Sequence, residues 1–285
     1  MPHFDCELVG KIGSMALIRR EDQDIDYNIF ARLCAELRPG MIWVSSGATE
    51  IGRLDYLKRG GAPLPEDDEF SKADYAAQGQ AILMELYRRF IPAQYSVRQV
   101  LIEHQHFNDA SKRAHIQKLL LHAAAQNAIP IINYNDPVSD AENRHLELVQ
   151  MRWQRGDEAR IVECVDNDET ASTVASLMRA RILLILTSVE GIYEDPNDPS
   201  TLVEEIGGKD IDEVLRNVRA MQAHCVGASR PGANGAKAKL EFLQEPLQNG
   251  TTVIIGHARH HIRDLVEGNV KRTVIGVRYR RVHHG

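Results

Sequence analysis

Two lysine-containing turns in this sequence have residue types suited to binding phosphate. Lys11 ends an apolar run and is followed by Gly13, and Lys237 and Lys239 follow the glycine-containing loop 230–235. Glycine lets backbone amides approach an anion closely, and a lysine in the first turn of a helix opposes the helix dipole unless an anion compensates it. Both turns therefore indicate a phosphate site, although a solvated lysine at a strand end also explains Lys11 when that turn is taken alone.

The segment Ser45-Ser46-Gly47 is a second candidate, because an apolar run changes there into a helix. The unpaired amides at a helix N-terminus point at a ligand, and the helix dipole favours negative charge. The segment can therefore hold an oxyanion or a phosphate. The alternative is that Ser46 only caps the helix.

Short polar side chains gather in two further segments. The apolar run 129–132 is followed by Asn133, Asn135 and Asp136. These residues either form a turn or bind an amino or carboxyl group of a substrate. Asp166-Asn167-Asp168 precedes a helical pattern, and capping that helix needs only one of the three. The others can serve a substrate, a lysine or a magnesium-bound phosphate.

Alternating apolar and amphipathic stretches predict the scaffold that positions these residues. Strands are expected at 7–18, 41–46, 96–103, 129–133, 182–187 and 251–256. Helices are expected at 26–37, 73–90, 109–126, 169–179, 211–222 and 235–243, where apolar residues recur every three or four positions. This alternation predicts an α/β fold with a mostly parallel sheet and helices on both faces. Ligands of such sheets bind beyond the carboxyl ends of the strands, where Thr187, Ser188 and Tyr193 also stand.

Composition narrows the class of function. The 285 residues carry a net charge of −6 and no long basic block, which argues against binding of nucleic acid. No apolar run approaches the length of about 20 residues that a membrane helix needs, and the N-terminal residues lack a secretory pattern. We therefore expect a cytoplasmic protein that handles a small molecule.

The cysteines and histidines give no signal for a metal. No Cys-x-x-Cys pair occurs, and the histidines at 104–106 and 257–261 have no carboxylate at ligand spacing. We expect exposed histidines and no protein-bound metal site.

The chain contains no linker or internal repeat, so we predict one continuous domain over residues 1–285. Two stretches rich in charge or proline, 60–71 and 140–160, are expected to be loops or small hairpins over its edge. A loop of this length is typically a lid or a substrate cover.

The order of these motifs resembles the amino acid kinase superfamily and, within it, the glutamate 5-kinase family. The shared series is a Lys-Gly turn, a Ser-Gly turn, an Asn-Asp loop, an Asp-Asn-Asp helix start, Thr-x-x-x-Gly-x-Tyr-x-x-Pro and Gly-x-Lys-x-Lys. Residues 76–80 resemble the Ala-Ala-Val-Gly-Gln helix of that family, and residues 265–268 resemble its last helix and Glu-Gly turn. The resemblance implies an αβα sandwich and a homo-oligomer. Many glutamate 5-kinases carry an RNA-binding-like C-terminal domain, and we expect no such domain here, because the resemblance to the catalytic domain extends to the end of the sequence.

Matching positions imply a role for each motif residue. The implied catalytic residues are Lys11, Asp168 and Lys239, with Asp168 orienting the lysines. The implied substrate-binding residues are Ser46, Gly47, Asn133, Asn135, Asp136 and Asn167. The implied nucleotide-binding residues are Lys11, Gly13, Thr187, Ser188, Tyr193, Asn234, Gly235, Ala236, Lys237 and Lys239.

The implied reaction transfers the γ-phosphoryl group of ATP, with Mg²⁺, to a carboxylate of a small amino acid and forms an acyl phosphate. Its loose transition state needs cations and amides rather than a covalent nucleophile. A carboxylate is already ionised at neutral pH, so no strong general base is required.

Three substitutions depart from the family pattern. Ser188 stands where the family has Asp in the nucleotide segment, Asn234 replaces a glycine of the phosphate loop, and Tyr134 replaces an acidic residue. The first two bear on how the nucleotide is held, and the third bears on the acceptor.

An insertion bears on the acceptor as well. Asp136 and Asp166 are 30 positions apart, a longer link than in glutamate 5-kinases, so 140–160 is interpreted as an inserted loop over the acceptor site. Its basic residues, which can admit a larger or more anionic acceptor, are Arg144, His145, Arg152 and Arg155. Two alternatives stay open: a kinase of the same fold that acts on a phosphate or phosphonate acceptor such as UMP, and a non-catalytic relative that binds a nucleotide or an oxyanion.

Overall fold

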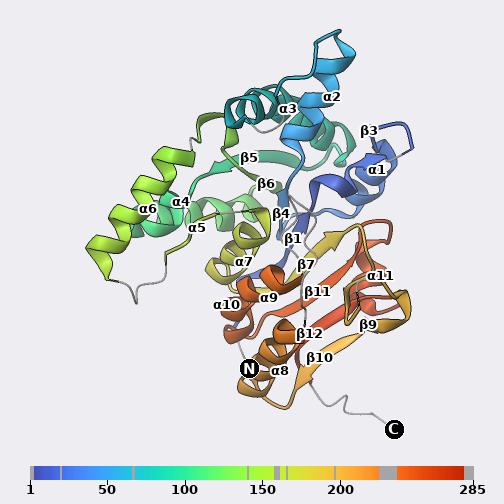
Figure 1. Cartoon of the computed structure of the whole chain (residues 1–285). Coiled ribbons are helices and arrows are strands. Elements are labelled where there is room, and N and C mark those ends of the chain that lie inside the picture. Colours follow the sequence, from blue (N-terminus) through green and yellow to red (C-terminus); the bar gives the residue numbers. More distant parts are fainter. Residues whose placement is uncertain are drawn as a thin grey trace. The chain divides into compact units, whose positions relative to one another are not determined.

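The computed structural model describes residues 3–19, 21–65, 68–139, 141–156, 161–164, 166–195, 197–224 and 236–278 (Figure 1). The chain divides into two compact units. Unit 1 comprises Met1–Lys11 and Ala171–Gly285, and unit 2 comprises Ile12–Thr170. Each unit is described by itself, and a single domain over residues 1–285 stays a prediction.

Eight strands belong to a mostly parallel sheet. In unit 1 the strand order is β10 (Glu205–Gly208), β12 (Thr273–Val277), β11 (Thr252–His257), β7 (Ala180–Thr187) and β1 (Cys6–Ile12). In unit 2 it is β4 (Met41–Ser45), β6 (Ala128–Tyr134) and β5 (Ser96–Ile102), all parallel. Strand β11 runs parallel to β7 but antiparallel to β12. The predicted α/β class with a mostly parallel sheet is thereby confirmed.

Helices surround these strands, and each of the six ranges expected to be helical contains one. Unit 2 contains α1 (Tyr27–Glu36), α2 (Ala48–Lys58), α3 (Glu69–Phe90), α4 (His104–Asn108), α5 (Ala110–Ala125) and α6 (Ala141–Arg155). Helix α7 (Asn167–Leu177) begins at the end of unit 2, and unit 1 contains α8 (Ile211–His224), α9 (Ala236–Phe242), α10 (Gln244–Gln248) and α11 (Ile262–Glu267).

Smaller elements join them. The 3-10 helices are η1 (Ser14–Ala16), η2 (Asp136–Val138) and η3 (Pro199–Thr201). The two-stranded pairs are β2 (Ile18–Arg19) with β3 (Asp24–Ile25), and β8 (Ile192–Tyr193) with β9 (Leu202–Val203). Over the described residues, no helix is both long and apolar enough to cross a membrane.

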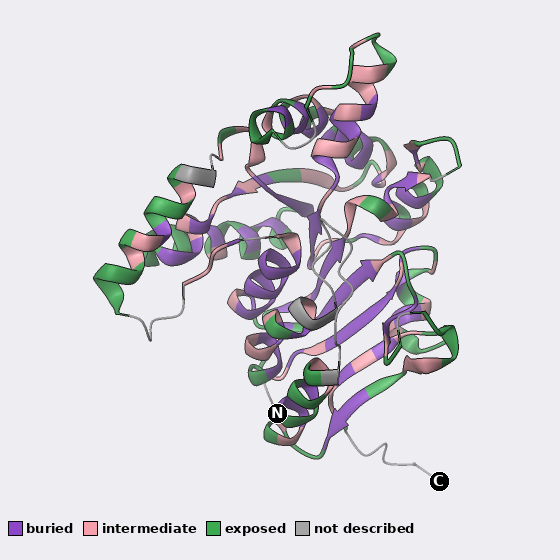
Figure 2. Cartoon of the chain, viewed as in Figure 1, coloured by how far each residue is buried: buried purple, intermediate pink, exposed green. Residues whose placement is uncertain are grey.

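Buried strands form the core of each unit. Every residue of β4 and β6 is buried, as is the run Ile182–Leu186 of β7 (Figure 2). Such apolar runs without polar alternation are typical of parallel strands that are covered on both faces. Because β4 and β6 are buried along their whole length, packing holds their ends in place, and with them the residues that follow each strand.

Two glycines allow α2 and α3 to pack backbone against backbone. A Cβ atom on Gly52 would lie 1.8 Å from Tyr75 O, and one on Gly79 would lie 1.8 Å from Ala48 O. Both distances are far inside van der Waals contact, so only glycine fits at these positions. This close packing holds the start of α2, and with it the turn after β4, against α3.

Two expectations from the sequence are wrong, one about the type of an element and one about where a strand ends. The charged stretch 140–160 was expected to be a loop, but Ala141–Arg155 form helix α6. Its apolar face is short, since Leu148 is the buried hydrophobic residue among the side chains described there, and so the apolar periodicity was weak. The strand expected at 7–18 ends at Ile12, because the chain turns at Gly13 into η1.

Candidate functional site

The turn after β4 places Ser46 and Gly47 at the start of α2. Gly47 is the N-cap residue with φ of 106°, a left-handed conformation that favours glycine, and a Cβ there would lie 3.0 Å from Leu17 Cδ1. The alternative that Ser46 only caps the helix is therefore wrong. Ser46 Oγ instead accepts a hydrogen bond from Asn167 Nδ2 at 2.9 Å.

A network of side-chain amides extends from Ser46 within unit 2. Asn167 Nδ2 also donates to Asn133 Oδ1 at 3.1 Å, and Asn133 Nδ2 donates to Gln80 Oε1 at 2.9 Å. Among the described residues, Asn167 Oδ1 and Gln80 Nε2 are buried and have no hydrogen-bond partner. Buried polar atoms are rarely left unsatisfied in proteins, so this amide network offers one acceptor and one donor to a ligand.

The Asp166 side chain caps helix α7. Asp166 Oδ1 accepts from the backbone amides of Asp168 at 2.8 Å and Glu169 at 3.0 Å. This agrees with the expectation that one of the three residues suffices for capping. Asn167 joins the amide network, and Asp168 is buried with 4% of its surface exposed.

Asn135 faces a different partner from Asn133. Its Nδ2 donates to Glu103 Oε1 at 2.8 Å. Burial raises the pKa of the Glu103 carboxyl, but hydrogen bonds from Asn135 and Gln105 outweigh it, so the pKa lies below its ordinary value. Asn135 thus holds an ionised carboxylate at the end of β5 and makes none of the hydrogen bonds of the amide network described above.

Asp136 begins η2, directly after the polar residues that follow β6. Burial raises the pKa of its carboxyl to about 6, against the attraction of the Arg144 guanidinium, which lowers it. Arg144 comes from α6, and its Cζ lies 5.9 Å from the centre of the Tyr134 ring. This corner of unit 2 therefore combines a carboxyl that resists ionisation with a partly buried cation.

In unit 1, three of the predicted nucleotide residues lie in strands. Lys11 is buried near the carboxyl end of β1, and Thr187 ends the neighbouring strand β7. Thr187 Oγ1 accepts from Val189 N at 3.0 Å and donates to Val189 O at 2.9 Å, which folds the turn that exposes Ser188. Tyr193 lies half-buried in β8.

The phosphate loop can be placed only in part. Lys239 is half-buried in α9, and Ala236 and Lys237 belong to the same helix. Asn234 and Gly235 lie outside the described residues.

The histidines differ from the exposed side chains that were expected. His104 is 3% exposed, and its Nε2 lies 2.9 Å from Glu147 Oε2. His260 Nε2 lies 2.7 Å from Glu190 Oε2. Both carboxylates are far from the histidines in sequence, which is why local spacing missed them. In the described part of the chain, no three His, Cys, Asp or Glu residues gather as a metal site would require.

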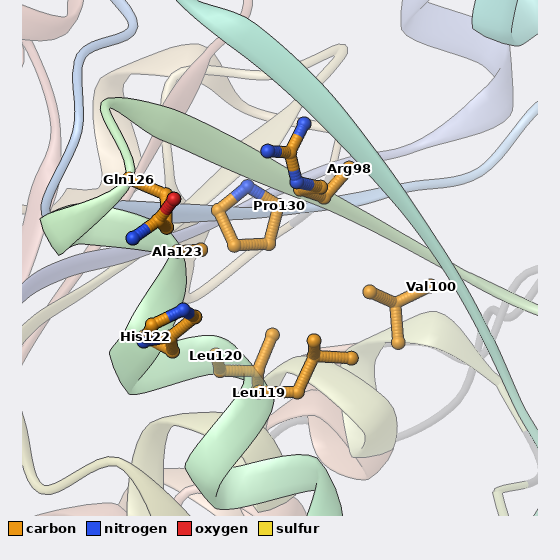
Figure 3. A pocket seen from close by; sticks show the side chains of 8 residues that line it. All are labelled: Arg98, Val100, Leu119, Leu120, His122, Ala123, Gln126 and Pro130. Atoms are coloured by element: carbon orange, nitrogen blue, oxygen red, sulfur yellow. The ribbon is translucent and has the colours of Figure 1, made fainter.

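Two hollows in unit 2 are lined by residues outside the candidate site. One has a volume of about 160 Å³ and lies between β5, β6 and α5, with Val100, Leu119 and Leu120 among the lining residues (Figure 3). The other has a volume of about 1110 Å³ and is lined by residues from α3 to β5. Neither hollow is lined by a predicted site residue, so the volume of a hollow does not indicate the position of the candidate site.

Comparison with known proteins assigns the family. Residues 7–257 match the amino acid kinase family. The chain belongs to this family. A glutamate 5-kinase of Dehalococcoides mccartyi (strain CBDB1) is 31% identical over 269 residues, which cover 91% of this chain and 64% of that enzyme. A glutamate 5-kinase of Alkaliphilus metalliredigens is 26% identical over 280 residues, 94% of each chain.

Solved structures of kinases share the fold of this amino acid kinase family member. A carbamate kinase from Giardia lamblia bound to AMP-PNP has a TM-score of 0.58 and 16% identity, over 97% of this chain and 100% of that one. A UMP kinase from Ureaplasma parvum has a TM-score of 0.53 and 13% identity, over 96% and 99%. At these identities the likeness concerns the fold alone.

The sequence motifs do not single out two residues that hydrogen-bond to candidate site residues. Gln80 lies in the helix motif 76–80 and ends the amide network. Glu103 ends the strand predicted at 96–103 and accepts a hydrogen bond from Asn135. A signal for Gln80 existed, since it stands among the buried residues Ala76, Leu83 and Tyr87 on one face of α3, where a polar residue needs a partner.

Proposed function

We propose that this chain is an ATP-dependent kinase that transfers the γ-phosphoryl group to a carboxylate of a small acid, as the name glutamate 5-kinase describes for its relatives. Family membership and the 31% identity to a glutamate 5-kinase support this assignment. The observation that carries it is the amide network, because Asn167 Oδ1 and Gln80 Nε2 are buried without a partner among the described residues. Such atoms suit the amino and carboxyl groups of an acid substrate.

In the proposed reaction, unit 2 holds the acceptor. Ser46, Asn133 and Asn167 would position the acid, with the backbone amides at the start of α2 facing its negative charge. Asp136 would contact an amino or hydroxyl group of the acceptor, since a carboxyl group accepts hydrogen bonds in either protonation state. Positioning of two reactants accounts for much of the rate in phosphoryl transfer.

The nucleotide would be bound by the remaining motif residues, most of which belong to unit 1. Lys11 and Lys239 would neutralise the charge that develops on the transferred group, and Asp168 would orient them. Gly13, Thr187, Ser188, Tyr193 and residues 234–237 would contact the nucleotide. Mg²⁺ would arrive with ATP as the magnesium–nucleotide substrate. A carboxylate acceptor is already deprotonated, so this chemistry asks no residue to act as a strong base.

The test offers purified protein ATP, magnesium and hydroxylamine with one acceptor at a time: glutamate, aspartate, N-acetylglutamate or UMP. We expect ADP and a hydroxamate with a carboxylate acceptor, because hydroxylamine traps an acyl phosphate. The variant Asn167→Ala should lose most of this activity, whereas Asn28→Ala, on the exposed face of α1, should retain it. ADP release with UMP alone would move the acceptor to a phosphate, and nucleotide binding without turnover would indicate a non-catalytic relative.

A homo-oligomer and a cytoplasmic location also stay predictions. Light scattering of the purified protein tests the first, and fractionation of the producing cells tests the second.

A further inference from the structure

The turn between β7 and β8, residues 188–191, is fixed at both ends by hydrogen bonds within unit 1. At its start, Ala258 N donates to Thr187 O at 2.8 Å, where β11 runs parallel to β7. At its end, Ile192 N donates to Oγ1 of the buried Thr273 at 2.8 Å. The two ends of the turn are thus held in place, and its conformation depends on the residues between them.

The side chains within this turn are placed against their hydration preferences. Val189 is 46% exposed and Ser188 is exposed as well, whereas Glu190 is only 9% exposed. A carboxylate loses strongly favourable hydration when it is buried, and a valine side chain would gain by burial instead. The turn therefore keeps this arrangement only because other residues compensate the Glu190 carboxylate.

The compensation comes from the turn that follows β11. Arg259 Nη2 donates to Glu190 Oε1, and His260 Nε2 lies 2.7 Å from Glu190 Oε2. Each carboxylate oxygen thus has a partner of its own, and a carboxylate that is bound through both oxygens has a fixed orientation. Glu190 therefore fixes the middle of the turn 188–191, as the hydrogen bonds fix its ends.

The residues that hold Glu190 are themselves ordered by His257, the last residue of β11. Arg259 N donates to His257 Nδ1 at 3.0 Å, and His260 N donates to His257 O at 3.0 Å. The rings of His257 and His260 have centres 6.3 Å apart and planes inclined by 77°. The partners of Glu190 therefore lie on a turn with a defined backbone, so they bind the carboxylate without first having to be ordered.

We propose that Glu190 is a positioning residue for the nucleotide, which holds Ser188 and Val189 in the orientation that the nucleotide contacts. This inference rests on the proposed kinase function, in which Thr187 and Ser188 contact the nucleotide. Glu190 acts through the turn, by way of Arg259 and His260, and needs no contact with the nucleotide itself. Loss of this anchor should therefore weaken nucleotide binding and leave the acceptor site unchanged.

Glu190→Gln is the first variant to test, because glutamine has nearly the same shape but only one terminal oxygen that accepts hydrogen bonds. Initial rates with varied ATP and with varied acceptor give kcat and the two KM values. Calorimetry with AMP-PNP and magnesium measures nucleotide binding without turnover. We expect KM for ATP and Kd for AMP-PNP to rise by about tenfold, as for the loss of one charge-assisted hydrogen bond, while the acceptor KM and kcat at saturation change little.

Two further variants test the contact itself. Glu190→Asp keeps the charge on a shorter side chain and should recover part of the nucleotide affinity. Arg259→Gln removes the anchor from its other side and should raise KM for ATP by a similar factor. The double variant with Glu190→Gln should be no worse than either single variant, because both changes remove the same contact.

Glu267→Gln is the matched control. Glu267 Oε1 accepts from Arg263 Nε at 2.9 Å, in an exposed ion pair on α11 of the same unit. The control makes the same chemical change to an ion pair that holds no predicted site residue. It should therefore behave as wild type in both assays.

The outcomes separate this proposal from the kinase function. Turnover with unchanged nucleotide affinity in Glu190→Gln would overturn the role of Glu190 and leave the kinase function standing, and a lower melting temperature alone would mark a purely structural ion pair. AMP-PNP binding without turnover, weakened by Glu190→Gln, would support the role of Glu190 and refute the kinase function. Absence of nucleotide binding by the wild-type protein would refute both. If circular dichroism shows that Glu190→Gln does not fold, Arg259→Gln decides in its place, since the Arg259 side chain is 61% exposed.

Discussion

Replacing Asp136 by asparagine tests whether burial of this carboxyl opposes its ionisation. Burial raises its pKa from the ordinary value of 3.8 to about 6, and the attraction of Arg144 is already included in that balance. Since one pKa unit corresponds to about 1.4 kcal/mol, ionised Asp136 destabilises the folded protein by about 3 kcal/mol at most. Asparagine has the same shape and no charge, so Asp136→Asn should stabilise the protein at pH 8.

The pH dependence follows from proton binding. Between about pH 4 and pH 6 the folded protein binds a proton at Asp136 that the unfolded chain has released, so wild-type stability falls as the pH rises. The variant lacks this group. The difference in the free energy of unfolding, variant minus wild type, should therefore be small at pH 4, grow through pH 6 and level off near pH 8.

Urea unfolding at intervals of half a pH unit, for both proteins in the same buffers, measures this difference. Asp74→Asn is the control, because Asp74 is an exposed carboxylate of α3. A difference that is independent of pH, or an Asp136→Asn variant that is less stable than wild type at pH 8, would refute the reasoning. It would mean that Asp136 stabilises the fold as the ion-pair partner of Arg144. Loss of acceptor binding in the same variant would be a separate result, on function.

Three further predictions concern packing, a buried hydrogen bond and catalysis. Gly79→Ala should lower the free energy of unfolding by about 3 kcal/mol, because its Cβ would lie 1.8 Å from a backbone oxygen of α2, and an unchanged urea midpoint would contradict this. Tyr87→Phe should cost about 1–2 kcal/mol in the same assay, since the fully buried Tyr87 hydroxyl donates to Ser45 Oγ at 2.8 Å, and a neutral effect would show that this bond adds nothing. Lys239→Ala should lower kcat by about 100-fold while AMP-PNP still binds, as measured by initial rates and calorimetry, and full activity would remove Lys239 from the proposed mechanism.

Local pattern was sufficient for much of the fold. The apolar runs of β4, β6 and β7 and the amphipathic periods of α5 and α8 were found within a few residues of their ends, because a strand or helix must bury its own apolar side chains whatever its partner. The high charge of 140–160 led to the wrong prediction of a loop there. Helix α6 forms with only a short apolar face around Leu148, because tertiary contacts hold it in place. The glycine turn at Gly47 was recognisable, since a left-handed residue favours glycine wherever it occurs.

The sequence by itself determined the class of the fold, the family and the motif residues, because these depend on side-chain period and on the order of short motifs. Only the tertiary structure decided which residues meet. Ser46 and Asn167 stand 121 positions apart and share a hydrogen bond, and Asn133 finds Gln80 at a separation of 53. It also distinguished the arginines of α6, since Arg152 and Arg155 have partners supplied by other segments, and Arg144 faces Tyr134. Such contacts depend on how separate elements pack, and no local pattern contains that information.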